Sequence, residues 1–210
     1  MIEPARPGLF ITFEGVEGSG KTTQADMLAR ALAPYEPLLF REPGGTEFGE
    51  RVRQLVLHTP GRISGEAEMY LFMAARAELI AERILPALRD GRVVIADRYH
   101  DSTRAYQGGG RGVQVEWPLS FPTPDLTILL AVSPDAGLNR RLAGGKAADR
   151  LESESLDFHR AVAAAYDRIA AEQPGRWLRL DAALGPEAVH DQVLQRVGPL
   201  LKEVIRSSSS

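Results

Sequence analysis

The fold of this chain is decided by one stretch, Gly15-Val16-Glu17-Gly18-Ser19-Gly20-Lys21-Thr22, which directly follows the apolar run Leu9-Phe10-Ile11-Thr12-Phe13. The stretch matches the pattern G-x-x-x-x-G-K-[ST], in which glycines allow the backbone N–H groups of a loop to approach phosphate oxygens. Aromatic and β-branched residues before it predict a strand, and leucines and alanines at helical spacing after it predict a helix. A strand, a glycine-rich loop and a helix in this order predict a phosphate-binding loop.

The loop supplies charge, hydrogen-bond donors and a metal ligand from a few neighbouring residues. In this pattern Lys21 reaches the β- and γ-phosphates of a nucleoside triphosphate, and the Thr22 hydroxyl is placed to bind Mg²⁺. The helix that begins here adds the positive end of its dipole. The residues predicted to bind the donor phosphates are Gly15, Val16, Glu17, Gly18, Ser19, Gly20, Lys21, Thr22 and Thr23.

Composition and charge exclude several classes of protein. The 210 residues and 44% hydrophobic content suit a single domain over residues 1–206, with residues 207–210 expected to form a disordered tail. A net charge of -3 gives no sign of a nucleic-acid or membrane-surface partner. The absence of cysteine excludes a disulfide scaffold and a thiolate metal site. No run is apolar enough for a signal peptide or a membrane span, so we expect a cytoplasmic protein.

Strand patterns alternate with helix patterns along the rest of the chain. Further strands are expected at Leu38–Phe40, Arg92–Asp97, Leu126–Val132 and Trp177–Leu180. Helices are expected over Lys21–Ala33, after Thr46, from Ser64 toward Leu88, after Ser133, and over Pro186–Ile205. Pro86 should kink or shorten the end of the longest helix. The alternation predicts an α/β fold with about five parallel strands covered by helices on both faces.

One segment, about residues 140–152, does not fit this alternation. It contains small, flexible residues around Gly144 and Gly145. Its cations are Arg140, Arg141, Lys146 and Arg150. This composition is typical of a mobile lid rather than of a core element. Closure of such a lid over a nucleotide would exclude water and bring a guanidinium group to the transferred phosphoryl group.

Charged residues follow two of the predicted strands, where a parallel sheet binds ligands. Asp97 ends an apolar strand, which is the position of a carboxylate that holds Mg²⁺ in phosphate-loop proteins, either directly or through water. Arg98 comes next, and Arg41 follows the strand Leu38–Phe40, so two guanidinium groups are expected to face the loop. They suit a second phosphorylated ligand, because the loop lysine is already committed to the triphosphate.

The helix from Ser64 carries two further candidates, Phe72 and Arg76, which lie four residues apart and so share one helical face. The pattern alone favours Phe72 as a core residue over a platform on which a base stacks. The chain lacks the Asn-Lys-x-Asp motif of GTPases, and Asp97 is followed by arginine rather than by the glutamate usual in AAA-type motors. The sequence therefore favours a small kinase.

Several stretches, taken together and in this order, resemble one family. They are Phe13 to Thr23, Arg41-Glu42-Pro43-Gly44-Gly45-Thr46, Leu71 to Arg76, Asp97-Arg98-Tyr99, Ser102-Thr103, Ala105 to Gly112, Pro124-Asp125-Leu126-Thr127 and Asp149-Arg150. In these stretches the chain resembles the bacterial type of thymidylate kinase, which transfers the γ-phosphate of ATP to dTMP. The resemblance covers about residues 8–205 and implies a P-loop kinase fold with a lid, ATP and dTMP as substrates, and Mg²⁺ as cofactor.

The resemblance also implies how dTMP is bound. Arg41 and Arg98 would hold its phosphate, and Glu17 would approach the 3′-hydroxyl of the deoxyribose. Phe72 would stack on thymine, which reverses the preference stated above, and Tyr106 would occupy the space of a 2′-hydroxyl. The remaining contacts to the nucleotide would come from Pro43, Arg76, Thr103 and Gln107.

For catalysis, the resemblance implies a cationic site around the transferred phosphoryl group. Its members would be Lys21, Arg98, Arg150 and, as second choice to Arg150 in the lid, Arg141. Thr22 and Asp97 would hold Mg²⁺. The family is homodimeric through packed helices, so a homodimer is expected. Two alternatives stay open, namely another nucleoside or nucleoside-monophosphate kinase of the same fold and a non-catalytic nucleotide-binding switch.

Overall fold

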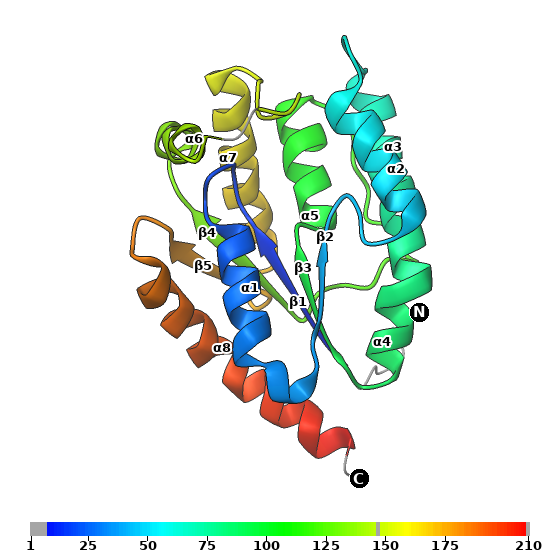
Figure 1. The fold of residues 1–210 in the computed structure, drawn as a ribbon, viewed down its shortest axis with the longest axis vertical. Coiled ribbons are helices and arrows are strands. Elements are labelled where there is room, and N and C mark those ends of the chain that lie inside the picture. The colour runs from blue at the N-terminus through cyan, green and yellow to red at the C-terminus, as the bar shows by residue number, and fades with distance from the viewer. Residues whose placement is uncertain (1–7, 146–147, 209–210) are drawn as a thin grey trace.

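The computed structural model describes residues 8–145 and 148–208, and the expected fold class is confirmed. Five parallel strands form one sheet in the order β2-β3-β1-β4-β5 (Figure 1). The strands are β1 (Leu9–Glu14), β2 (Leu38–Arg41), β3 (Val93–Asp97), β4 (Leu126–Ala131) and β5 (Trp177–Asp181).

The two central strands, β1 and β3, are buried along their whole length. Their register pairs Leu9 with Val93 and Phe13 with Asp97. Every position is apolar or satisfied, as a strand covered on both faces requires. Because the strands are parallel, the carboxyl ends of β1, β2 and β3 meet at one edge of the sheet, where the loops and polar residues gather.

Helices cover both faces of the sheet. They are α1 (Lys21–Ala31), η1 (Ala33–Tyr35), α2 (Glu47–His58), α3 (Gly65–Leu79), η2 (Ile80–Ile84), α4 (Leu85–Arg89), α5 (His100–Thr103), η3 (Arg104–Gly110), α6 (Pro134–Ala143), α7 (Leu156–Glu172) and α8 (Pro186–Ser208). On one face α1 and α8 bury Leu28 and Val193 against the odd-numbered side chains of β1. On the other face η2 and α4 pack on Phe10 and Val94, while η3 and α7 pack on Leu129.

Local capping chemistry sets several helix starts as expected. Thr46 accepts a hydrogen bond from the N–H of Gly49, Ser64 from that of Ala67, and Ser133 from that of Ala136. The helix expected from Ser64 toward Leu88 is divided, because a π-helical turn over Ile80–Ile84 precedes a short α4 that has Pro86 in its first turn. Proline has no N–H to donate to the preceding turn, which explains why the pattern changes there.

Two expectations are corrected by the structure. The helix α6 runs to Ala143, so Arg140 and Arg141 stand on a helix and not in the flexible part of the expected lid. The helix α8 runs to Ser208, two residues into the segment expected to be a disordered tail, whereas Ser209 and Ser210 lie outside the described residues. The lid cation Lys146 also lies outside them. Among the described helices, none has the length and apolar character to cross a bilayer.

Candidate active site

The phosphate-binding loop takes backbone conformations that its glycines permit. Gly15, Gly18 and Gly20 have φ angles of 144°, 67° and 91°, and α1 begins directly after the third of them. At Gly18 a Cβ atom would lie 2.0 Å from the carbonyl oxygen of Gly137 in α6. Glycine is therefore required there both by φ and by the close approach of α6.

Lys21 folds back into this loop. Its Nζ donates to the carbonyl oxygen of Val16 at 2.8 Å and to Ser19 Oγ at 3.3 Å. Burial lowers the pKa of the Lys21 ammonium to about 8, and the nearby charge of Arg98 acts in the same direction. The carboxylates of Glu17, Asp97 and Glu14 act in the opposite direction, and an anionic phosphate next to Lys21 would likewise favour the charged form.

Thr22 and Asp97 form an oxygen-rich pair beside the loop. Thr22 Oγ1 donates to Asp97 Oδ2 at 2.5 Å, although the two residues belong to α1 and to the end of β3. Asp97 also lies 3.8 Å from Nε of Arg41, whose side chain is 58% exposed. A hydroxyl and a carboxylate are hard oxygen ligands of the kind that Mg²⁺ prefers, so the residues present fit this ion.

Glu17 of the loop is joined to the next wall of the site. Its Oε1 accepts from Arg98 NH2 at 2.5 Å and from the Tyr106 hydroxyl at 3.1 Å. Arg98 also donates to the carbonyl oxygen of Gly15 at 3.2 Å, and its guanidinium lies 5.0 Å from the centre of the Tyr106 ring. Burial alone would raise the pKa of Glu17, but the charges of Arg98 and Lys21 lower it to about 2. Glu17 is thus held as an anion between two cations.

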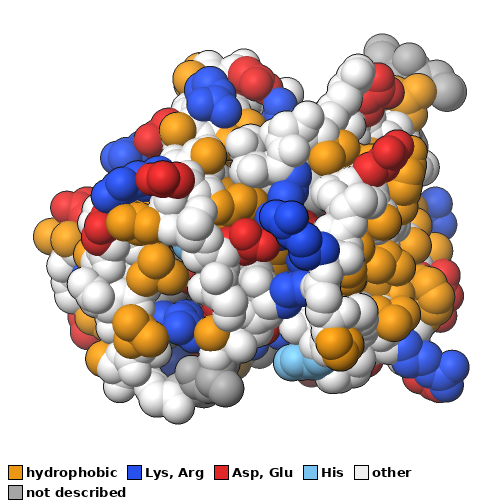
Figure 2. All heavy atoms as spheres, turned by 90° about the horizontal axis from the view of Figure 1, so that it is seen from above, with side chains coloured by type: hydrophobic (Ala, Val, Ile, Leu, Met, Phe, Trp, Pro, Cys, Tyr) orange, Lys and Arg blue, Asp and Glu red, His pale blue; other side chains and the backbone are white. Residues whose placement is uncertain are grey.

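A cavity opens beside this ion pair and extends to α3. It is lined by Glu17, Arg41, Glu42, Pro43, Arg53, Leu57, Phe72, Arg76, Arg98, Ser102, Thr103, Tyr106, Gln107, Asp149, Leu151 and Glu152. The structure therefore brings together all nine residues that the sequence assigned to the second ligand. Phe72 belongs to a buried cluster with Val52 and Val56 and also lines the cavity, so its role as a platform for a base stays a prediction. In the view from above, basic and acidic side chains lie side by side in the hollow at the centre of the molecule (Figure 2).

Arg76 is fixed at the bottom of this cavity. Its Nε donates to Glu42 Oε2 at 2.6 Å, NH1 to Thr103 Oγ1 at 2.9 Å, and NH2 to the carbonyl oxygen of Tyr99 at 3.0 Å. The side chain is 2% exposed. NH1 also donates to Met73 Sδ at 3.9 Å, so the N–H left over is on NH2, and the rigid guanidinium can present this donor to the cavity.

A second cavity, of about 530 Å³, adjoins the other side of the loop at Gly15 and Val16. The ends of β4 and β5 and the helices α6 and α7 line it, with Arg140 and Asp181 among its polar residues. The phosphate-binding loop thus lies between two cavities. This arrangement suits the meeting of two ligands at one phosphate site.

Comparison with known proteins agrees with this geometry. The family described as thymidylate kinase matches residues 13–193. A thymidylate kinase of Thermomicrobium roseum is 47% identical over 207 residues, which are 94% of this chain and 98% of the relative. A thymidylate kinase of Pelotomaculum thermopropionicum is 41% identical over 212 residues, which are 96% and 98% of the two chains. The chain belongs to the thymidylate kinase family.

A solved structure supports the same assignment. The thymidylate kinase from Ehrlichia chaffeensis matches with a TM-score of 0.71 at 31% identity, over 90% of this chain and 98% of that chain. The resemblance seen in the sequence motifs is therefore confirmed. This member of the thymidylate kinase family is a nucleoside monophosphate kinase, that is, a phosphotransferase.

The arginines expected in the lid form hydrogen bonds with residues outside the phosphate-binding loop. Arg150 donates from NH2 to Glu68 and from Nε to the carbonyl oxygen of Val56. Arg141 NH1 lies 3.3 Å from Glu152 Oε2, and Arg140 donates to the carbonyl oxygen of Ala182 at 2.7 Å. Of the two candidates, Arg141 stands four residues after Gly137, the residue of α6 that contacts the loop.

Sequence reasoning missed the buried carboxylates that support the site. Glu14 accepts from the N–H of Tyr99 at 2.8 Å and from the hydroxyls of Ser102 at 2.6 Å and Tyr166 at 2.8 Å. Burial, together with the charge of Asp101, raises its pKa to about 7. Burial likewise raises the pKa of Glu42 to about 7, against the effect of Arg76. Glu14 and Glu42 stand in motif stretches that the sequence singled out, which is the signal that points to them.

Proposed function

We propose that the thymidylate kinase reaction takes place here where the Glu17–Arg98 contact joins the phosphate-binding loop to the cavity over α3. ATP would place its phosphates on the loop, and dTMP would fill the cavity with its phosphate toward the loop. One observation carries this proposal: Glu17 belongs to the loop, lines the cavity, and is held by two cavity residues, Arg98 and Tyr106. This contact supports a meeting of the two ligands at one place, as phosphoryl transfer requires.

The phosphate ends of both ligands are held by cations. Lys21 exchanges its contact with the Val16 carbonyl oxygen for the phosphates of ATP. Arg98 and the more exposed Arg41 bind the phosphate of dTMP, with Arg98 oriented beforehand by Glu17 and Tyr106. Thr22 and Asp97 would hold Mg²⁺. When bound, this ion neutralises charge on the β- and γ-phosphates.

The nucleoside of dTMP is placed by the walls of the cavity. Phe72 stacks on the base, and Arg76, Thr103 and Gln107 contact its polar edge, with Pro43 closing one side. Tyr106 stands against the sugar, where a 2′-hydroxyl would collide with its ring. Since Arg76 is already anchored by three hydrogen bonds, binding of the base costs little further ordering of this side chain.

An assay of ADP release tests the proposal directly. With ATP and Mg²⁺, the protein is expected to turn over dTMP far better than dCMP, dGMP or AMP. Preferred turnover of another monophosphate would show a different nucleoside-monophosphate kinase of the same fold. Binding of ATP without turnover of any of them would show a nucleotide-binding switch.

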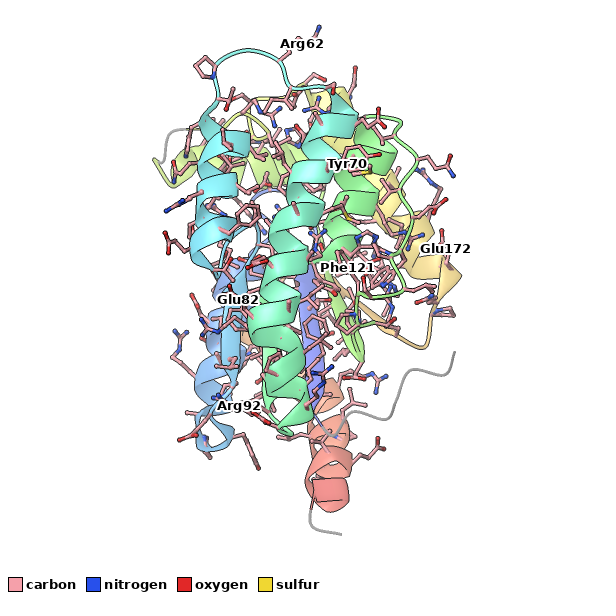
Figure 3. All side chains as sticks on the ribbon, turned by 90° about the vertical axis from the view of Figure 1, so that its right-hand side faces the viewer. Arg62, Tyr70, Glu82, Arg92, Phe121 and Glu172 are labelled. Carbon is pink, nitrogen blue, oxygen red and sulfur yellow. The ribbon has the colours of Figure 1, made fainter. Side chains whose placement is uncertain are left out.

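We also propose that two copies of the chain associate through the outer face of α2 and α3. Phe48 and Leu55 on α2 are 46% and 54% exposed, and Tyr70 on α3 is 60% exposed. Figure 3 looks onto this face, and Figure 2 shows hydrophobic side chains gathered on the same side of the molecule. Large apolar side chains on adjacent helices suit a helix-packed homodimer. The expected location in the cytoplasm stays a prediction.

A further inference from the structure

Glu68 is a fully buried carboxylate in α3 that does not line the cavity itself. Its Oε1 accepts from Gln107 Nε2 at 2.7 Å and from Arg111 Nε at 3.4 Å. Its Oε2 accepts from Arg150 NH2 and, at 3.5 Å, from Arg111 NH2. Donors from η3, from the residue after it and from the segment before α7 thus converge on one side chain behind the base site.

This arrangement determines which way the amide of Gln107 faces. A carboxylate oxygen accepts hydrogen bonds and donates none, so Gln107 must turn its NH₂ group toward Glu68. The carbonyl oxygen Oε1 of the amide then points away from Glu68. Gln107 lines the cavity, and no donor among the described residues forms a hydrogen bond to its Oε1. The cavity therefore receives an acceptor from Gln107 and a donor from NH2 of Arg76.

An acceptor from Gln107 beside a donor from Arg76 is complementary to a 4-keto pyrimidine. Thymine and uracil carry an acceptor, O4, next to a donor, N3–H, whereas cytosine carries an amino group next to an acceptor nitrogen. We propose that Glu68 is a positioning residue that holds Gln107 Oε1 toward the base and so selects 4-keto over 4-amino pyrimidines. The inference rests on the proposed function, because it assumes that the base of a nucleoside monophosphate lies in this cavity.

The surrounding charges provide a matched control. Arg111 also donates from NH2 to Glu154 Oε1 at 2.7 Å. The guanidinium of Arg111 lies 4.6 Å from the centre of the Phe158 ring. Glu154 therefore belongs to the same ion network, but it makes no hydrogen bond to Gln107. Removing its charge perturbs the network without freeing the amide.

The decisive measurement is the ratio of kcat/KM for dTMP to that for 5-methyl-dCMP. The two nucleotides differ only at position 4 and in the proton on N3. In Glu68→Gln the new amide can donate as well as accept, so Gln107 can turn its NH₂ group to the base. The ratio is expected to fall by roughly tenfold or more, as for a mismatched buried polar group. Glu154→Gln should leave it unchanged, and an unchanged ratio in Glu68→Gln overturns the inference.

A double-mutant cycle shows whether Glu68 acts through Gln107. Gln107→Met keeps the length of the side chain and removes the amide. In this background Glu68→Gln should not change the ratio further, whereas an additional fall would show that Glu68 acts by another route. Should Glu68→Gln fail to fold, the ratio is read in Glu68→Gln combined with Arg111→Gln, which restores the charge balance at a residue that contacts Glu68 but is not part of the proposed catalytic set.

Failure of the proposed function can be distinguished from failure of the inference about Glu68. If the wild-type protein does not phosphorylate dTMP, the proposed function fails. The ratio of the Kd for 5-methyl-dCMP to the Kd for dTMP, measured by competition in wild type and in Glu68→Gln, then still tests the role of Glu68. Equal Kd ratios in the two proteins overturn it, and a ratio that falls in the variant supports it.

Discussion

Tyr106 contacts Glu17 and Arg98 and also lines the cavity. We expect its hydroxyl and its ring to have separate roles. The hydroxyl donates to Glu17 and accepts from Arg98 at 3.2 Å, whereas the ring occupies space next to the proposed sugar site. Tyr106→Ala should therefore raise kcat/KM for the ribose counterpart of dTMP relative to dTMP itself, by about tenfold. Tyr106→Phe keeps the ring and should keep the discrimination. Equal ratios in Tyr106→Ala and wild type would place the discrimination elsewhere, with Glu17 the next residue to test.

Glu14 makes stability depend on pH. Its folded-state pKa is raised from 4.5 to about 7, so between these values the folded protein binds a proton that the unfolded chain has lost. This contribution to stability is complete below pH 4.5 and is lost as pH rises through about 7. Glu14→Gln, which cannot ionise, should gain stability relative to wild type between pH 5 and pH 8, by on the order of 3 kcal/mol at most. Urea unfolding at the two pH values measures the difference, and a pH-independent difference would contradict the prediction.

At the scale of elements, the segment between α6 and α7 joins the two sides of the site. Arg150 is bound to Glu68 and to the end of α2, so its action at the transferred phosphoryl group requires this segment to move when ATP binds. We expect Arg150→Ala to lower kcat by at least roughly 10²-fold, with a smaller change in KM for dTMP, because the cation would serve the transition state.

The matched comparison is Arg141→Ala, which removes the second candidate arginine, on α6. A larger fall in kcat for Arg141→Ala than for Arg150→Ala would assign the role to Arg141. An effect of Arg150→Ala on KM for ATP alone would make Arg150 a ground-state contact.

The elements that the sequence predicted are those set by local chemistry. Thr46, Ser64 and Ser133 cap their helices through their own hydroxyls, so a short window of sequence contains the signal. The π-helical turns Ile80–Ile84 and Arg104–Gly110 have no such signal, because they depend on how neighbouring helices pack. The helix α7 was not among the expected elements, although Phe158, Val162, Ala165 and Ile169 follow helical spacing.

A residue of the candidate site could be predicted from the sequence where its motif gives that residue type one established role. Lys21 in its loop is such a case, and the cavity residues followed from the family resemblance. The buried carboxylates could not be predicted in the same way. Burial of Glu68 is tolerable only because donors from positions 107, 111 and 150 surround it, and that convergence exists only in the folded chain.

At the scale of the whole molecule, the proposed dimer makes a simple prediction. Tyr70→Asp places a charge in the middle of the exposed apolar face of α2 and α3 and should convert the dimer to a monomer in sedimentation velocity runs. Leu119→Asp is the control, since Leu119 is 99% exposed and belongs to the connection before β4 rather than to α2 or α3. Two monomeric variants, or a monomeric wild type, would contradict the assignment of this face.

The central place of β1 has a consequence for biosynthesis. This strand is made first, but its two neighbours, β3 and β4, come much later, and Phe10 finally donates to Asp125, 115 positions further along the chain. Until β4 leaves the ribosome, an apolar strand with open edges must be kept from other nascent chains, and closing such distant contacts makes folding slow. The phosphate-binding loop, proposed to bind ATP, directly follows this same strand. An incomplete chain that ends before Leu126 can pair β1 with β3 but leaves the other edge of β1 open, so the strand before the loop is secured on both sides only after β4 has been made.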